Sequence, residues 1–454
     1  MKPSISSSPG SSPGASRVQI PVSMNRRSFL KTSVAASAVL AVGHAMAEDK
    51  SRPIRLGIIG TGERGTGLLQ TLLLFPQVEV PAVCDLVHNR ANQAAGLVEK
   101  KTGRPPEIYA GSELAWEGLV KRADLDAIII ATPWEWHARM AVAAMRAGKY
   151  PGSEVPAAIT VQECWDLVRT SEQTAVPCMM LENVCYFENV MALLRMVREG
   201  LFGEVQHCEA GYQHDCRFLM FDEKGELTWR GHHAMTKNGN LYPTHPLGPV
   251  AQWMNINRGD RLVSLTSIST PAKALQHYAA RKFGPEHPAA RRAYAMGDVN
   301  TTLLQTANGR TVTLYFNLMT HRPYDLILRL EAVKGIYLGT NDSICLEDDK
   351  KPSDQWEPFT PYRQKFEHPL WKALRGPALS SGGHGGAEYL MFHDFLKAVR
   401  NKVPAAQDVY DAAVWSAVFP LSIESVAKGG KPVKFPDFTG GQWKKKPPVP
   451  VYGA

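Results

Sequence analysis

Three closely spaced glycines have the pattern of a phosphate-binding turn. Gly60, Gly62 and Gly65 form G-x-G-x-x-G directly after the apolar stretch 54–60, at the start of a helical pattern. In that setting the first glycine permits a tight turn, the second lets a pyrophosphate approach the backbone, and the third lets the helix pack on the strand. Asp85 ends the next strand-like segment, where a carboxylate accepts bonds from ribose hydroxyls and repels a 2′-phosphate. The spacing therefore predicts a dinucleotide cofactor, and NAD rather than NADP.

Aromatic and charged side chains follow a further strand-like segment. The segment ATPWEWHA, residues 131–138, lies at the carboxyl end of the apolar run 125–133. Ligands bind at that end of the strands in open parallel sheets, and exposed tryptophans usually have a ligand or a partner to cover. We therefore expect this segment to face a ligand, although its two tryptophans could also pack on the sheet edge.

Tyrosine and histidine side chains, which can move protons, are concentrated in the middle of the chain. Histidine titrates near neutrality, and tyrosine can act when its phenol is polarised. The stretch NGNLYPTH, residues 238–245, is polar and shaped by glycine and proline, which suits a site loop rather than a core. A structural hydrogen-bonding role is the alternative for His214, His232 and His233. The candidates are Tyr212, His214, His232, His233, Tyr242 and His245.

The glycine turn and the ATPWEWHA segment require a parallel sheet to position them. Apolar runs that are typical of strands alternate with helical patterns over residues 54–183. One of the helices opens with a capping box from Thr160 to Glu163. This alternation predicts a doubly wound parallel sheet of the Rossmann type. We expect strands at 54–60, 78–85, 125–133, 150–154 and 176–183, and helices at 65–75, 88–102, 137–147 and 160–175.

The pattern changes after residue 186, where successive strands replace the strand–helix alternation. Short turns such as ANGR join several of them, which indicates an antiparallel sheet. Two late helices, at 386–400 and 408–427, are expected to return and pack on the first domain. The predicted fold class is α/β, with a Rossmann domain over 53–186, an α+β domain with an open antiparallel sheet over 187–440, and a tail over 441–454. After a helix at 188–200, the expected strands are 205–214, 262–270, 299–307, 311–318, 326–333 and 335–340.

Residues 1–47 are predicted to be an export signal preceded by a disordered segment rich in serine, proline and glycine. NRRSFLK, residues 25–31, precedes the apolar run 34–42 and three small residues. Paired arginines followed by Phe-Leu-Lys are typical of the twin-arginine route, which exports folded proteins. We expect cleavage after Ala47 and delivery to the periplasm. An ordinary secretory signal is the alternative to the twin-arginine signal. An exported protein that stays tethered to the inner membrane is also compatible with this segment.

Charge and cysteine content argue against several classes of function. The formal net charge is +8, but the signal holds five basic residues and no acidic ones, so the remainder carries +3. That excess is spread out apart from Lys444–Lys446, so no nucleic-acid partner is expected. The seven cysteines form no CxxC pair and are expected to be buried free thiols. No metal-ligand spacing is present, so no metal is expected.

Four motifs, taken in order, resemble the Gfo/Idh/MocA oxidoreductase family. They are GIIGTGERG, VCD, ATPWEWHA and GSEVPAA, and the resemblance extends over residues 53–440. That family joins a Rossmann domain to an open antiparallel sheet, which often forms a dimer face, so the resemblance implies a homo-oligomer. Many members carry Glu-Lys-Pro where this chain has Glu154-Val155-Pro156, and their lysine assists proton transfer. Val155 has no proton to move, which argues against the usual sugar dehydrogenase chemistry.

A longer set of motifs is similar to glycoside hydrolase family 109. They are SEVPAA, LENVCYF, GYQHDCR, HRPYD and the stretch HHAMTKNGNLYPTHPLGPVAQWMNINRGDR. Members of that family are NAD-dependent α-N-acetylgalactosaminidases, and many carry twin-arginine signals. The resemblance therefore implies hydrolysis of terminal α-N-acetylgalactosamine from glycans or glycoconjugates, with NAD as the cofactor and the twin-arginine translocase as a partner during export.

Carried over motif by motif, the resemblance implies two sets of contacts. Arg230 would contact a sugar hydroxyl or acetamide, although a surface ion pair is the alternative. Trp229 would stack on a sugar face or only pack. Besides the three glycines, the implied cofactor contacts are Glu63, Arg64, Asp85, Trp134, Glu135, Trp136, His137, Glu154, Val155 and Asn183. The implied substrate contacts are Tyr212, Arg230, Tyr242, Pro243, Thr244, His245 and Tyr324.

A hydrolase can use NAD when a transient oxidation makes elimination possible, and NAD-dependent glycosidases are an exception to the use of two carboxylates. Oxidation at C3 makes the C2 proton acidic, the C1–O bond breaks by elimination, water adds at C1, and hydride returns to C3 with net retention. A cofactor that is never released can then work in a compartment without an NAD pool. We place His245 near C3, because the wider family has a histidine in the equivalent THPLG helix. Tyr212, with His232 or His233, is assigned to the C2 and leaving-group steps.

Two other functions are compatible with the sequence. An NAD-dependent sugar or cyclitol dehydrogenase would form NADH in step with its product, and Val155 argues against its usual form. A non-catalytic sugar- or nucleotide-binding sensor would bind without turnover. The concentration of tyrosine and histidine side chains argues against the sensor.

Overall fold

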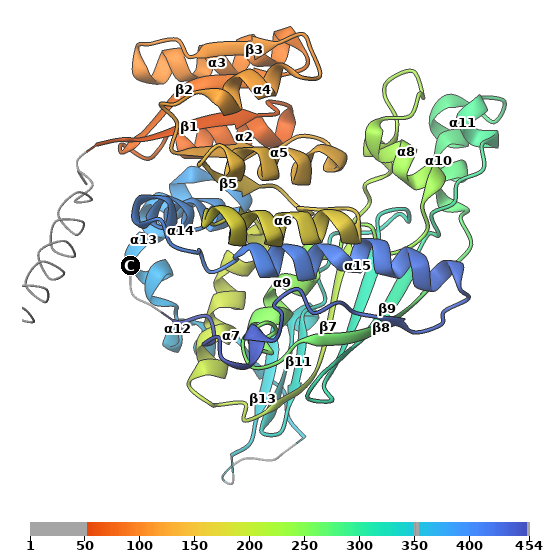
Figure 1. Ribbon diagram of the computed structural model, residues 1–454. Coiled ribbons are helices and arrows are strands. Elements are labelled where there is room, and N and C mark those ends of the chain that lie inside the picture. The colour runs from red at the N-terminus through yellow and green to blue at the C-terminus, as the bar shows by residue number, and fades with distance from the viewer. Residues whose placement is uncertain (1–51, 349, 351–353, 452–454) are drawn as a thin grey trace, which may run out of the picture. The chain divides into compact units, whose positions relative to one another are not determined.

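The structure is a computed structural model that describes residues 52–348, 350 and 354–451 (Figure 1). The predicted signal, residues 1–47, therefore lies outside the described residues. From Pro53 onward the chain forms one compact unit that contains two sheets. The division into domains at residue 186 stays a prediction. Within the described ranges, no helix is both long and apolar enough to cross a membrane.

The first sheet is parallel, as predicted, and has six strands in the order β3-β2-β1-β4-β5-β6, of which five were expected and β3 was not. The chain builds outward from β1 in one direction and then from β4 in the other. The carboxyl ends of β1 and β4 therefore flank the crevice in which ligands bind in such sheets. The strands are β1 (Ile54–Ile59), β2 (Val78–Asp85), β3 (Glu107–Ala110), β4 (Ala127–Ile130), β5 (Tyr150–Ser153) and β6 (Met179–Met180).

The helices of this part connect successive strands. The capping box that opens α6 is present: the Thr160 hydroxyl accepts from the N–H of Glu163 at 3.1 Å, and the Glu163 carboxylate accepts from the N–H of Thr160 at 3.0 Å. Helix α5 begins at Trp134 rather than at residue 137, so Trp134–His137 form its first turn. The helices are α2 (Glu63–Leu72), α3 (His88–Thr102), α4 (Ala115–Lys121), α5 (Trp134–Arg146), α6 (Val161–Thr174), η1 (Asn183–Tyr186) and α7 (Glu188–Arg198).

The second sheet has nine strands in the order β14-β13-β12-β11-β7-β10-β9-β8-β15. Its pairs are antiparallel, which confirms the prediction, except that β7 and β10 run parallel. The exception arises because β8, β9 and β10 form a meander whose third strand returns beside β7 in the same direction. The strands are β7 (Val205–Gln213), β8 (Leu262–Ser269), β9 (Asn300–Thr306), β10 (Thr311–Asn317), β11 (Arg329–Ala332), β12 (Gly335–Leu338), β13 (Ser343–Leu346), β14 (Glu357–Pro358) and β15 (Val433–Lys434).

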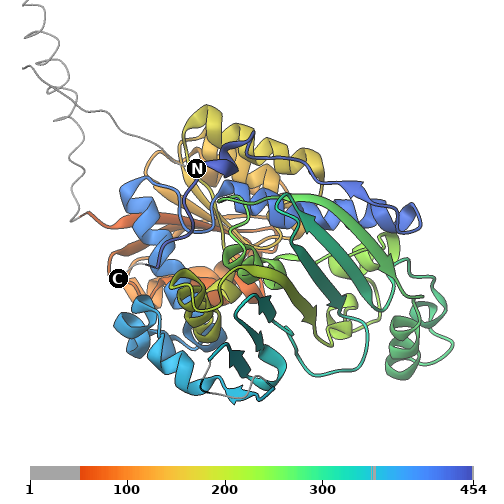
Figure 2. The same cartoon turned by 90° about the horizontal axis from the view of Figure 1, so that it is seen from below.

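The two late helices return to the parallel sheet, as predicted. Helix α14 (Ala387–Asn401) packs on α2 and β1, and α15 (Val409–Ala427) packs on α6, β6 and β8. Helix α15 is buried on almost all sides because its sequence is apolar all round. In Figure 1 it runs between α6 and the strands β8 and β9, and Figure 2 shows the second sheet from below. Helix α15 therefore joins the two sheets.

Shorter helices surround the second sheet. Two of them, α8 and α9, lie in the long connection between β7 and β8, where the polar stretch NGNLYPTH separates them. The remaining helices are η2 (Arg217–Met220), α8 (Trp229–Thr236), α9 (Thr244–Trp253), α10 (Ala274–Phe283), α11 (Pro288–Arg291), η3 (Gly339–Asn341), α12 (Thr360–Lys365), α13 (Pro369–Ser381), η4 (Gly383–Gly386) and η5 (Gln442–Lys444).

The cysteines form no cross-links. All seven are free thiols and six of them are buried, which confirms the prediction. Burial, with a smaller contribution from Asp85, raises the pKa of Cys84 to about 12, so this thiol stays protonated at neutral pH. Across residues 52–348, 350 and 354–451, no group of three or more histidine, cysteine, aspartate or glutamate side chains could hold a metal ion.

Candidate active site

The glycine turn has the geometry of a dinucleotide-binding turn. Gly60 has a φ of +86°, and a Cβ there would lie 2.5 Å from the carbonyl oxygen of Ala131. A Cβ on Gly65 would lie 1.8 Å from the carbonyl oxygen of Gly60. These close approaches hold β1, β4 and the start of α2 together. A Cβ on Gly62 would meet nothing nearer than 3.9 Å, so the space in front of this residue is open.

The start of α2 offers backbone donors to that space. Gly62 is the N-cap residue, and no side chain within the described ranges caps the helix. The first N–H groups of an uncapped helix, together with the helix dipole, favour an anion. Asp85 at the end of β2 accepts from the N–H of Thr61 at 2.7 Å and from the N–H of Val87 at 2.9 Å, which fixes the adjoining loop. The open space and the uncapped helix fit the pyrophosphate of a nicotinamide dinucleotide.

Arg64 connects the glycine turn to Glu154-Val155-Pro156. Its Nε donates to Oε1 of Glu154 at 2.7 Å, and a terminal nitrogen donates to Glu388 of α14. The second oxygen of Glu154 accepts from the N–H of Val155 at 3.2 Å. Val155 itself is buried, and its apolar side chain cannot transfer a proton. Glu63, the residue before Arg64, is exposed.

The first turn of α5 divides its four candidate residues between different environments. Trp134 is buried and its ring lies 5.5 Å from that of Tyr242, so it faces the second half of the chain. Trp136 packs instead under the guanidinium of Arg139, 5.2 Å from the ring centre. His137 is buried with its two ring nitrogens 2.7 Å and 2.8 Å from the carbonyl oxygens of Thr132 and Pro156. These contacts give His137 a positioning role, and cofactor contact by this segment stays a prediction.

Three of the predicted catalytic and substrate residues meet beyond the carboxyl edge of the parallel sheet. The rings of Tyr212, Tyr242 and His245 lie 4.9 to 5.0 Å apart, and we call them the Tyr–His cluster. Tyr324 joins its rim, 5.9 Å from Tyr212, and His214 lies 5.3 Å from Tyr324. Burial raises the pKa of Tyr212 and of Tyr242, so both phenols stay protonated at neutral pH. They can donate a proton or a hydrogen bond.

Glu182 lies behind His245 and is a site residue that sequence reasoning missed. Nδ1 of His245 lies 2.6 Å from Oε1 of Glu182, which also accepts from the N–H of Val184 at 3.0 Å. Glu182 is fully buried just beyond β6. A carboxylate only accepts, so the proton of the neutral imidazole is assigned to Nδ1 and Nε2 keeps its lone pair. An acidic residue at the carboxyl end of a predicted strand was a signal that could have identified it.

Arg230, on the first turn of α8, is held by aromatic faces. Its guanidinium lies 4.3 Å from the ring centre of Trp229, 5.0 Å from that of Trp134 and 5.8 Å from that of Tyr242. Such contacts orient a cation over π-faces without using its N–H groups. Within the part of the chain that the structure describes, Arg230 makes no hydrogen bond or ion pair with the protein. Its donors are therefore available to a ligand beside the Tyr–His cluster.

The structure separates His233 from His232, which the sequence could not do. The buried ring of His233 stacks on Trp134 at 5.2 Å. Its Nδ1 accepts from Nζ of Lys237 at 2.9 Å, and its Nε2 lies 3.4 Å from Oε2 of Glu135. Both ring nitrogens of His233 are thus occupied. His232 lies on the exposed face of α8, away from the Tyr–His cluster.

Several buried polar atoms around the cluster have no hydrogen-bond partner among the described residues. They include Oδ1 of Asn183, Oγ1 of Thr244 and Oε2 of Glu182. Buried polar groups in proteins are almost always hydrogen-bonded, so such atoms at the edge of a site indicate a polar ligand or ordered water. Thr244 opens α9 next to Pro243, which places both at the entrance of that helix. Their contacts with substrate, and that of Asn183 with cofactor, stay predictions.

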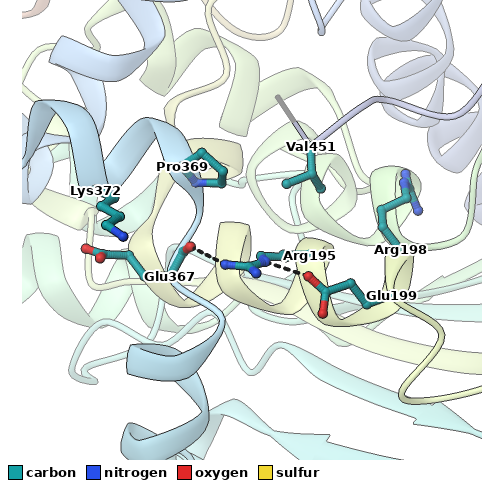
Figure 3. Close-up of a pocket in the computed structure, with 7 residues that line it drawn as sticks. All are labelled: Arg195, Arg198, Glu199, Glu367, Pro369, Lys372 and Val451. Atoms are coloured by element: carbon teal, nitrogen blue, oxygen red, sulfur yellow. Dashed lines mark hydrogen bonds and ion pairs between the residues drawn. The ribbon is translucent and has the colours of Figure 1, made fainter. Parts of the chain in front are cut away.

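A separate cavity of about 560 Å³ lies between α7 and α13 (Figure 3). One of its walls is an internal network in which Arg195 donates to Glu199 at 2.6 Å and to the carbonyl oxygen of Glu367 at 2.9 Å. None of the predicted site residues lines it. The cavity is lined by Arg195, Arg198, Glu199, Glu367, Pro369, Lys372 and Val451.

Known families match the chain in three segments. The family model described as glycosyl hydrolase 109, C-terminal domain, matches residues 186–445. The oxidoreductase family with an NAD-binding Rossmann fold matches residues 54–182, which shows a nicotinamide-cofactor domain. A twin-arginine translocation signal matches residues 23–43, so the chain is exported by that route, which leads to the periplasm.

Individual proteins agree with these matches. A glycosyl hydrolase family 109 protein of Stenotrophomonas maltophilia is 41% identical over 94% of this chain and 98% of its own length. A protein of Tannerella forsythia named alpha-N-acetylgalactosaminidase is 41% identical over 93% of this chain and 98% of its own length. A levoglucosan dehydrogenase solved with NADH and levoglucosan shares the fold with a TM-score of 0.64 at 19% identity, over 85% of this chain and all of its own.

The Rossmann turn, the mixed second sheet and the Tyr–His cluster therefore belong to a glycoside hydrolase built on the Gfo/Idh/MocA oxidoreductase fold. The family model covers more than half of the chain, and relatives are 41% identical along nearly all of it. The chain belongs to glycoside hydrolase family 109.

Proposed function

We propose that this enzyme hydrolyses terminal α-linked N-acetylgalactosamine from glycans or glycoconjugates, with NAD as a retained cofactor and with net retention. The name of the Tannerella forsythia relative supports the substrate class. The carboxylate at the end of β2, Asp85, supports NAD over NADP, since it would repel a 2′-phosphate.

The state of the carboxylates is the observation that carries the mechanism. An ordinary glycosidase needs two carboxyl groups free to act on the glycosidic bond. Around the Tyr–His cluster, Glu182 binds His245, Glu154 binds Arg64 and Glu135 binds His233. The hydrogen bond with His233 also lowers the pKa of Glu135, which makes it a poor acid. This arrangement favours a route through transient oxidation over a carboxylate pair.

Bound NAD would supply hydride acceptance at C3 of the sugar and return of that hydride after hydrolysis. The residues of this chain manage the protons. His245 accepts a proton at Nε2, because Glu182 holds the proton of the neutral ring at Nδ1. Tyr212 keeps its phenol proton and can donate it to the leaving oxygen, and Arg230 offers free N–H groups to the sugar. His233 has both nitrogens occupied and therefore positions Trp134 rather than transferring protons.

The test uses mature protein freed of nucleotide, a chromogenic α-N-acetylgalactosaminide, and NAD⁺ at far below the substrate concentration. Release of many equivalents of aglycone per NAD⁺, without accumulation of NADH, is the expected result. NADH formed mole for mole without aglycone would instead establish a dehydrogenase. Nucleotide binding with neither product would contradict the substrate assignment and direct the search to other sugars and then to a sensor.

Replacing Glu182 by glutamine is expected to lower kcat by roughly 100-fold while leaving nucleotide binding unchanged. The amide can offer its N–H₂ to Nδ1 of His245, which would move the ring proton to Nε2 and remove the base. Glu182→Asp should recover part of the activity. The measurement is kcat and KM against pH, because a purely structural role would not change the acid limb. Glu199→Gln, in the separate cavity, is the control, and equal kcat in both variants would refute the positioning role.

The exposed face of the second sheet supports the prediction of a homo-oligomer. Ile268 of β8 and Leu303 of β9 are 62% and 48% exposed on neighbouring strands. Apolar side chains exposed together on a sheet usually have a partner. We therefore include in the proposal that this face pairs with a second copy of the chain. The proposal also keeps the division of the chain into two domains at residue 186.

A further inference from the structure

The loop between α13 and α14 reaches the glycine turn through a chain of charged contacts. The loop, Gly382–Gly386, reads GGHGG, and Glu388 lies directly after it in the first turn of α14. Nδ1 of His384 lies 2.6 Å from Oε1 of Glu388, and the same oxygen accepts from the guanidinium of Arg64. Residues more than 300 positions apart in the sequence thus meet beside the start of α2.

Ordering the backbone of this loop has a high cost in conformational entropy and in backbone strain. Gly382, Gly385 and Gly386 have φ of +78°, +67° and +96°, and His384 itself has a φ of +44°. A run of glycines loses more conformational entropy than other sequences when it becomes ordered. The left-handed conformation at a histidine adds strain. The side-chain contact between His384 and Glu388 helps to hold this conformation.

The side chain of Glu388, which links His384 to Arg64, holds a negative charge in a buried position. Glu388 is 2% exposed, and burial alone would raise its pKa. The contacts with His384 and Arg64 outweigh burial and hold the pKa of Glu388 down to about 2. The carboxylate is therefore ionised at neutral pH. A buried carboxylate of this kind fixes the side chain of Arg64, which lies between the second and third glycines of the turn.

We infer that His384, Glu388 and Arg64 form a latch that closes the Gly382–Gly386 loop against the dinucleotide site and slows release of the cofactor. The inference rests on the proposed use of a retained cofactor. An exported enzyme cannot replace a lost nucleotide outside the cell, so slow release has a direct value for it. His384 is the accessible half of the latch, because its side chain is 53% exposed while that of Glu388 is 3% exposed. His384 and Glu388 are positioning residues, since neither is assigned to contact with the substrate, the cofactor or the reacting atoms, and both act through Arg64.

The test measures nucleotide release rather than glycoside cleavage. Holoenzyme loaded with NADH is diluted into excess NAD⁺, and the fall in bound-NADH fluorescence gives the dissociation rate. His384→Ala is expected to release NADH at least about tenfold faster, because a hydrogen bond to a charged group is lost. His384→Asn should restore much of the slow release, since its amide nitrogen can occupy the place of Nδ1 and asparagine tolerates a positive φ.

The control is Lys428→Ala, which breaks another pair of side chains four residues apart, with Glu424 on α15. It should release NADH at the rate of the unchanged protein. Glu388→Gln keeps the shape of the side chain and removes its charge, and this variant should release NADH as fast as His384→Ala. If His384→Ala does not fold, the release rate of Glu388→Gln is the test of the latch. Unchanged release from these variants, at an unchanged melting temperature, would overturn the latch. Failure of the unchanged protein to bind any nucleotide would overturn both latch and cofactor use, whereas failure to cleave the glycoside alone would leave the latch standing.

Discussion

His245→Ala is expected to lower kcat for glycoside cleavage by about 10³-fold, because it removes the base of the Tyr–His cluster. Glu182 holds Nδ1 of this ring at 2.6 Å, so the lost group is the free Nε2. The hydrogen bond of the ring is made with Glu182, which keeps the N–H of Val184 as a partner in the variant, so the affinity for nucleotide should persist. The measurement combines steady-state cleavage with calorimetric titration of NAD⁺.

The matched control for this variant is His277→Ala, since His277 is an exposed histidine on α10. It should cleave at the unchanged rate. A His245→Ala enzyme with unchanged kcat and a raised KM would show that this residue binds the sugar without transferring a proton. Equal activity of both variants would remove His245 from the site altogether.

Gly65→Ala is expected to destabilise the protein by about 3 kcal/mol or more, and to prevent folding if the turn cannot move. The new Cβ would lie 1.8 Å from the carbonyl oxygen of Gly60, and that partner is backbone that cannot rotate away. Gly67→Ala is the control two residues further along α2, because nothing lies within 4 Å of its Cβ. It should be neutral or stabilising by up to about 1 kcal/mol, since alanine favours a helix.

Gly62→Ala completes this series and separates folding from binding. Its Cβ would meet no atom closer than 3.9 Å, so the variant should be nearly as stable as the unchanged protein. It would place a methyl group in the space left for the pyrophosphate and weaken nucleotide binding strongly. Free energies of unfolding in urea and NAD⁺ titrations distinguish the three variants. A stable Gly65→Ala, or tight NAD⁺ binding by Gly62→Ala, would contradict these roles of the turn.

Local patterns were sufficient to predict five of the six strands of the parallel sheet, all but β3. Strands such as β1 and β2, and helix α3 after β2, differ little from the predicted segments, because each is determined by residues close in sequence. The capping box of α6 depends on Thr160 and Glu163 alone. Helix α5 began earlier than expected because Trp134–His137 have polar and aromatic side chains that pack against other elements instead of following a simple apolar period.

Pairing and packing between segments that are distant in sequence could not be predicted from local patterns. The parallel pairing of β7 and β10, and the strands β13 to β15, depend on which edges meet in the folded sheet. Helix α15 was predicted as a helix from its own sequence, but its place between two sheets follows from burial on all sides.

The sequence by itself determined the kind of chemistry: a glycine turn for a dinucleotide, an export signal, and tyrosine and histidine side chains able to move protons. The tertiary structure decided which of them act together. It brought Glu182 to His245 across 63 positions and Arg64 to Glu388 across 324, and it turned His233 toward Trp134 while leaving His232 exposed. The physical reason is that a turn or a helix is specified by neighbours in sequence, whereas the partner of a buried charge is specified by which surfaces pack together.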